Sequence, residues 1–238
     1  MDTRAGQEER DLKTHVLNQA ISTLPKLTSQ QRAALVVVFF VRNSRFVGPL
    51  ELATYYQYVT DYLGPFVESM SEKRSDTLYM QYTGVGSISI ASITLDMAFY
   101  ESAFGYFSNG FLRGVEGLPL AVTPSPWVAH IDDPEIFMPC LRDPSKLQLR
   151  ARSTGDVAEL ARKNSLPDLV TYQATGRMQP DEIRDDLISH VPPLAKLFDN
   201  WDSSGLSHFE LTAVGIAIAH ACQRRLTNSS APLDTFLS

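Results

Sequence analysis

The stretch TSQQRAALVVVFFVR, residues 28–42, decides the fold of this 238-residue chain. No polar side chain interrupts it from Ala33 to Val41, and a helix that is apolar on every side belongs in a protein interior. Thr28, followed three residues later by Gln31, is the capping-box pattern that starts a helix. The valines and phenylalanines also favour a strand. The cap and the length of the segment nevertheless predict a buried helix, around which the rest of the chain packs.

The composition is typical of a folded, soluble protein. Apolar residues make up 44% of the chain and charged residues 20%, unlike a disordered sequence. The net charge of −6 argues against broad binding to nucleic acid or anionic membranes, but leaves room for a local basic patch. Two cysteines, Cys140 and Cys222, are too few for a disulfide framework and predict a reducing, cytoplasmic location. No apolar run is long enough to span a bilayer and the N-terminus is charged, so we expect no membrane partner.

Helical periodicity recurs on both sides of the central stretch. An amphipathic helix is predicted to end at Pro25, and its short link to Thr28 predicts a helical hairpin with the buried helix. The closing stretch AVGIAIAHACQRR, which begins at Ala213, predicts a small-residue helix that packs against the central one. Gly215 would permit close contact there. Further helices are predicted at 49–70, with a break or kink at 64–65, at 95–107 and 154–163, and at 180–201, where Pro192-Pro193 must bend or restart the helix so that 194–201 is a second piece.

Two stretches alternate in the manner of strands. The sequence LYMQYTGVGSISIASI, within residues 77–93, is rich in β-branched residues and predicts a short hairpin or an irregular turn. Residues 146–152, KLQLRAR, predict a strand with Leu147 and Leu149 inward and Gln148 outward. The expected fold class is therefore mainly α, a multi-helical bundle with minor β.

A change in composition suggests how the chain is divided. Residues 117–144 are rich in proline, which favours an extended connector, and Trp127 predicts that this connector is docked on the surface. We therefore expect an N-terminal helical lobe at 1–116, the connector at 117–144, and a C-terminal helical lobe at 145–238 that packs on the first. The alternative is one single domain.

No motif predicts a catalytic, cofactor or metal site. The segment Gly84–Gly86 lacks the third glycine of a dinucleotide fingerprint and the lysine of a P-loop. His130, Asp132 and Asp133 could ligate a metal, but no partner pattern follows, and an acidic turn explains the carboxylates equally well. Tyrosines cluster at 55–62. Since no arginine or lysine is interleaved with them, a core edge is favoured over a platform for stacking bases.

One set of basic residues could contact nucleic acid. The outward face of the predicted strand carries Lys146, Arg150 and Arg152, and the last helix ends with Arg224 and Arg225. Arginine and lysine on one face are the footprint of phosphate binding. We favour the alternative, in which these side chains are solvated, pair with nearby acids, or complement the C-terminus of a helix.

Several segments resemble, in the same order, the signatures of an uncharacterised bacterial family of helical domains. That family is associated with anti-phage and mobile-element neighbourhoods. The resemblance implies a shared helical domain and carries over no catalytic residue. Family members are longer at the N-terminus, which implies that this chain lacks a leading segment. The matching segments are 18–21, 24–28, 35–42, 82–89, 107–111 and 211–219.

Three functions are consistent with these observations. We favour a non-enzymatic protein–protein interaction or assembly domain of a bacterial anti-phage protein, with a homo-oligomer or another protein as partner, because no acid, base and nucleophile converge. The first alternative is a nucleic-acid-binding module, since Phe209–Thr212 and the helix after it resemble the wing-to-helix joint of winged-helix proteins. The second is an enzyme whose site only the fold assembles, with His130, Asp132 and Asp133 as its starting point.

Overall fold

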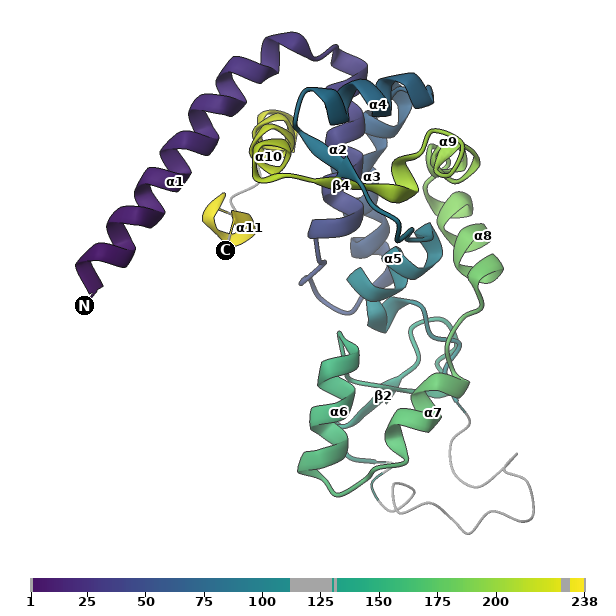
Figure 1. The fold of residues 1–238 in the computed structure, drawn as a ribbon. Coiled ribbons are helices and arrows are strands. Elements are labelled where there is room, and N and C mark those ends of the chain that lie inside the picture. The colour runs from purple at the N-terminus through teal and green to yellow at the C-terminus, as the bar shows by residue number, and fades with distance from the viewer. Residues whose placement is uncertain (1, 112–129, 131, 228–231, 238) are drawn as a thin grey trace. The chain divides into compact units, whose positions relative to one another are not determined.

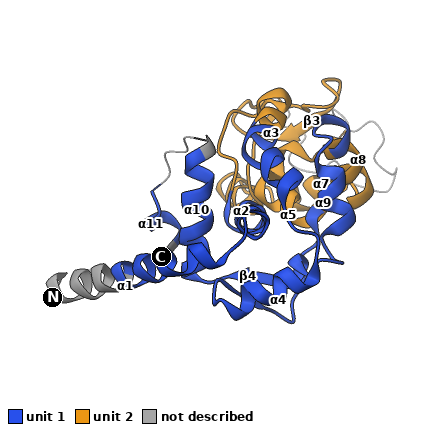
Figure 2. Ribbon diagram, turned by 90° about the horizontal axis from the view of Figure 1, so that it is seen from above, with its two compact units in different colours: residues 1–44, 58–95, 188–238 blue, residues 45–57, 96–187 orange. Residues whose placement is uncertain are grey.

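The computed structural model describes residues 2–111, 130, 132–227 and 232–237, without the side chains of 2–12, 172, 226–227 and 237. These residues form two compact units (Figure 2). Unit 1 comprises residues 1–44, 58–95 and 188–238, and unit 2 comprises 45–57 and 96–187. This grouping differs from the expected division at 117–144, because each unit combines segments that are distant in sequence. Half of the expected connector, residues 117–129 and 131, lies outside the described residues.

Helix α2 (Ser29–Asn43) confirms the prediction made from the central stretch. The Thr28 hydroxyl accepts a hydrogen bond from the Gln31 amide at 3.2 Å, and the Gln31 side chain accepts one from the Thr28 amide at 3.0 Å. Every residue from Ala33 to Val41 is buried. Helix α10 (Ala213–Thr227) packs along α2, as expected.

Helix α1 (Asp2–Thr23) departs from the expected hairpin. Among the described residues it packs mainly on α10 rather than on α2 (Figure 1). The link η1 (Leu24–Lys26) does turn the chain between α1 and α2. However, α10 brings a complementary face of small side chains, and it takes the position beside α1.

The expected hairpin at 77–93 is wrong. Its first half is helix α4 (Arg74–Tyr82), because burial of Thr77 and Met80, three residues apart, follows the helical period. Its second half is strand β1 (Gly86–Ile88), which pairs antiparallel with the distant β4 (Phe209–Leu211). In this register, Gly86 is opposite Leu211.

Unit 2 holds the other strand pair and an aromatic core. Strands β2 (Phe137–Pro139) and β3 (Leu147–Leu149) pair antiparallel. Strand β3 is shorter than the strand predicted at 146–152. Gln148 does not point outward: it is buried, donates to the Gly105 carbonyl at 3.0 Å, and accepts from the Leu141 amide. These bonds compensate for burying a polar amide.

The tyrosine cluster supports the core interpretation. Tyr55 is buried in unit 2 and stacks on Tyr106, with 4.6 Å between ring centroids. Tyr56 is also buried, so neither ring is available as a platform for bases.

The remaining helices complete a mainly α fold with two short strand pairs among the described residues. Helix α3 is continuous through Pro65, so the break that was one of the two alternatives there does not occur. Helix α7 lies in a region for which no regular element was predicted. The elements are α3 (Leu52–Ser69), α5 (Leu95–Ser102), η2 (Phe104–Tyr106), α6 (Thr154–Lys163), α7 (Leu169–Thr175), α8 (Pro180–His190), α9 (Leu194–Asn200), η4 (Leu206–His208) and α11 (Asp234–Leu237).

Candidate functional site

The predicted basic strand face belongs to unit 2, and its cations contact protein groups. Lys146 pairs with Asp143 at 3.5 Å between Nζ and Oδ2. The Arg150 side chain donates to the Pro134 carbonyl at 2.7 Å, and Arg152 donates to the Val47 carbonyl at 3.2 Å. The exposed guanidinium groups of Arg150 and Arg152 are therefore hydrogen-bonded to loop carbonyl groups of the same unit.

The other two predicted contacts, Arg224 and Arg225, lie exposed in the last turn of α10 in unit 1. The five basic residues are thus divided between the two units. Cys222 lies nearby on the same helix. Burial raises the pKa of its thiol, although Arg32 and Arg225 oppose that shift. A thiol of raised pKa holds little thiolate and is a poor nucleophile.

The acidic segment near His130 forms a turn. The His130 carbonyl accepts a hydrogen bond from the Asp133 amide at 2.8 Å, and the Asp133 carboxylate accepts one from the Glu135 amide at 2.9 Å. Within the described part of the chain, no three His, Cys, Asp or Glu side chains are grouped so as to hold a metal ion. The geometry of this segment is that of an Asx turn.

Sequence reasoning missed a charged network in unit 2. Arg142 and Asp186 form an ion pair whose side chains are only 17% and 9% exposed. The Tyr56 hydroxyl donates to Asp186 Oδ2 at 2.7 Å and accepts from Arg142 Nη2 at 3.0 Å. Burial, together with the bond to Asp186, raises the pKa of Tyr56 far above its usual value. All three side chains are bonded to one another, and the phenol of Tyr56 stays neutral. We therefore interpret the network as one that stabilises the fold of unit 2 and not as a site of proton transfer.

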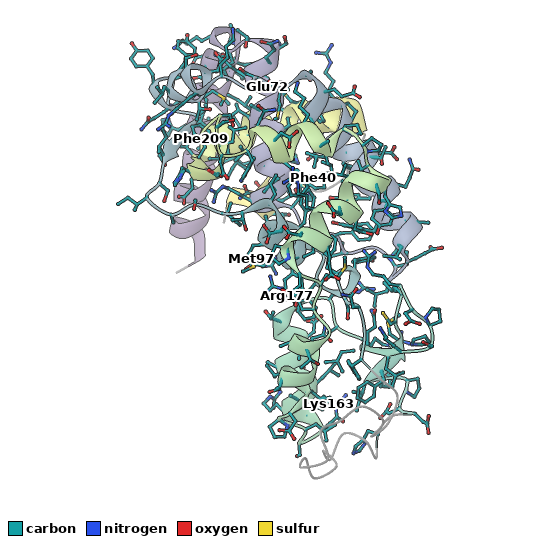
Figure 3. The ribbon with its side chains drawn as sticks, turned by 90° about the vertical axis from the view of Figure 1, so that its right-hand side faces the viewer. Phe40, Glu72, Met97, Lys163, Arg177 and Phe209 are labelled. Atoms are coloured by element: carbon teal, nitrogen blue, oxygen red, sulfur yellow. The ribbon has the colours of Figure 1, made fainter. Side chains whose placement is uncertain are left out.

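Arg177 in unit 2 is a second engaged cation. Its guanidinium carbon lies 4.0 Å from the centroid of the Tyr100 ring, and Nη2 lies 3.5 Å from the Met97 sulfur (Figure 3). This cation–π arrangement stabilises the fold by an amount on the order of 1 kcal/mol.

A pocket of about 510 Å³ opens in unit 1. Its walls are the first turn of α4, the end of β1 with the segment that follows it, and η4 with the loop that leads into it. The walls include two charged side chains, Arg74 and Asp202, for which no hydrogen bond or ion pair is found among the described residues. They also include Ser207, whose buried hydroxyl has no partner there.

Unit 1 also exposes a group of apolar side chains, which we call the α1–α4 face. Ile21 is 70% and Tyr82 is 86% exposed. The Tyr79 hydroxyl donates to the Lys26 carbonyl at 3.4 Å, which joins α4 to the end of η1, and its ring lies 6.2 Å from that of Tyr82. The α1–α4 face consists of Ile21, Leu24, Leu78, Tyr79 and Tyr82.

Comparison with known proteins identifies a family. A family model with the description ":-like" matches residues 1–237, so the chain belongs to this family. Its description gives no activity, substrate or partner. No curated protein and no solved structure matches the chain. Among the described helices, none has both the length and the apolar character needed to cross a membrane.

Proposed function

We propose that this chain is a non-enzymatic assembly domain that binds a second copy of itself through the α1–α4 face. The observation that carries the proposal is the exposure of Ile21, Leu24, Leu78, Tyr79 and Tyr82 on neighbouring elements. Large apolar groups gathered on one surface are uncommon in monomeric proteins, and they mark sites of interaction. Tyrosines in particular are enriched at protein interfaces.

The chemistry of the face favours self-association. All five side chains are uncharged, so two identical copies can meet across a two-fold axis without repulsion between like charges. Burying one large aliphatic side chain contributes about 1.5–3 kcal/mol, and Ile21 and Leu24 are present twice in a symmetric contact. The resemblance to a family from anti-phage neighbourhoods supports a role for this assembly in a bacterial defence protein.

Light scattering over a range of protein concentrations tests the proposal. The wild-type chain should have a mass above that of the monomer, and the Ile21→Lys, Tyr82→Lys double variant should be monomeric with an unchanged midpoint of unfolding. Val47→Lys is the matched control: Val47 is an exposed aliphatic residue of unit 2, and this variant should assemble normally.

Two outcomes would overturn the proposal. One is a wild-type chain that stays monomeric at every concentration. The other is a chain that gains mass only when nucleic acid is added at low salt, because steep salt dependence is the signature of phosphate binding. That second outcome would favour the nucleic-acid alternative.

A further inference from the structure

We infer that the pocket of unit 1 binds a small molecule of mononucleotide size through its phosphate group. This inference is independent of the assembly proposed above. It rests on three properties of the pocket: the arginine, histidine and serine hydroxyl that line it, the unpaired carboxylate on its wall, and its volume.

The first property is a set of donors suited to a phosphate. Arg74 lies in the first turn of α4, and its guanidinium has no hydrogen bond or ion pair among the described residues. A guanidinium presents paired donors that match the geometry of phosphate oxygens. Ser207 also lines the pocket, and its hydroxyl is buried without a partner among those residues. Rotation of this side chain toward the pocket would let a ligand oxygen remove the free-energy cost of that burial.

His208 supplies a further group on the same wall. Its Nδ1 lies 3.2 Å from the carbonyl oxygen of Ser89. Because a carbonyl oxygen can only accept, Nδ1 carries the hydrogen. The other ring nitrogen, Nε2, is then the one left for a ligand. It donates to a phosphate oxygen when the ring is protonated, and accepts from a ligand hydroxyl when the ring is neutral.

The second property, the carboxylate of Asp202, favours a ligand that has a hydrogen-bond donor in addition to its phosphate. Asp202 also lines the pocket, and no ion pair joins it to Arg74 among the described residues. An inorganic anion would leave this exposed carboxylate to water alone. A ribose hydroxyl or an exocyclic amine of a base would donate to it. Ile88 and Ile90, both exposed on the same pocket, offer apolar contact to a sugar or a base.

The third property is size. A volume of about 510 Å³ lies within the range of roughly 300–1,000 Å³ that is typical of small-molecule sites. A single phosphate ion would fill only a minor part of it. The phosphate donors, the carboxylate acceptor and the free volume together specify a nucleoside monophosphate.

Calorimetric titration of the full chain tests this inference. The probes are AMP, GMP, CMP and UMP, with adenosine and inorganic phosphate as the two halves of one ligand. At least one monophosphate should bind, and more tightly than either half. Arg74→Ala should weaken that binding by at least about tenfold, and Asp202→Ala, which removes the acceptor, should weaken the monophosphate but not inorganic phosphate.

Control variants keep the result interpretable. Arg224→Ala removes an exposed arginine of the same unit that does not line the pocket, and it should leave binding unchanged. Unfolding midpoints of all variants show whether each one is folded. If Arg74→Ala fails to fold, Ser207→Ala gives the same test, with weaker binding expected. The inference is overturned if none of the four monophosphates binds, if adenosine or phosphate binds as tightly, or if folded Arg74→Ala or Ser207→Ala binds as the wild type does.

Discussion

The carbonyl oxygen of Val85 lies where a side chain on Gly215 would have to be: a Cβ atom built there would be only 1.9 Å from this oxygen. The same carbonyl accepts a hydrogen bond from the Thr212 amide at 3.1 Å. The Thr212 hydroxyl in turn donates to the Gly84 carbonyl at 2.8 Å. The start of α10 is therefore fixed on the turn between α4 and β1.

Gly215→Ala should destabilise unit 1 by roughly 2–3 kcal/mol, because the methyl group meets rigid backbone rather than a movable side chain. Denaturant unfolding followed by circular dichroism measures the change. Gly155→Ala in α6 is the control, since its methyl group meets only an ordinary contact with Ser153 at 3.5 Å. That variant should be neutral or slightly more stable. Equal midpoints for the two variants would contradict the close contact at Gly215.

Thr28→Ala should lower the free energy of unfolding by about 1 kcal/mol, since it removes the hydroxyl that caps α2. Thr28→Ser keeps a capping oxygen and should retain most of the stability. The same unfolding experiment compares the two variants. A serine variant as unstable as the alanine variant would show that the methyl group of Thr28, and not its hydroxyl, is what matters.

Asp186→Asn should destabilise unit 2 by about 3–5 kcal/mol, because it leaves the Arg142 cation largely buried without its counter-charge. The double variant Arg142→Met, Asp186→Leu should be considerably more stable than Asp186→Asn, because an apolar pair leaves no charge unpaired. Glu72→Gln is the control: it breaks a more exposed pair with Lys196 and should change little. Thermal or denaturant unfolding checks all three.

The free energy of unfolding should decrease at alkaline pH because the phenol of Tyr58 ionises. Burial, with a smaller effect from Tyr62, raises the pKa of Tyr58 to about 12, whereas a tyrosine of the unfolded chain ionises near pH 10. The contribution of this phenol is therefore complete below pH 10 and is lost as the pH rises to about 12. Tyr58→Phe should make the fall shallower in unfolding midpoints measured from pH 9 to 12. Tyr82→Phe, at an exposed ring, should keep the wild-type profile.

The parts of the fold that local chemistry determines could be predicted from the sequence. The capping box and the unbroken apolar run of α2 are local signals, and the small residues of α10 indicate a close helical partner. Strand β1 could not be assigned to its partner, since β4 is separated from it by the longer segment of unit 2. Gln148 was misplaced because an alternating pattern does not show which amide will find buried partners.

The candidate sites were hidden for a related reason. Arg142 and Asp186 are distant in sequence, and each one taken alone is an ordinary surface charge. Arg74, Ser207 and Asp202 belong to no motif, and only the packing of α4 against the loop before η4 brings them to one pocket. An amphipathic helix that ends at Pro25 was predicted, but helical periodicity alone does not show that the apolar side chain of Ile21 is exposed.

The way unit 1 is divided along the chain has a consequence for its synthesis. Helix α2 leaves the ribosome long before α10, which begins only at Ala213 and belongs to the last segment of the unit. At about 5–20 residues per second, the interval between them is on the order of ten seconds. Both segments of unit 2 are made within this time and can fold first. Until α10 has been made, the nascent chain therefore carries α2, which has no polar side chain from Ala33 to Val41, without the helix that packs most extensively along it.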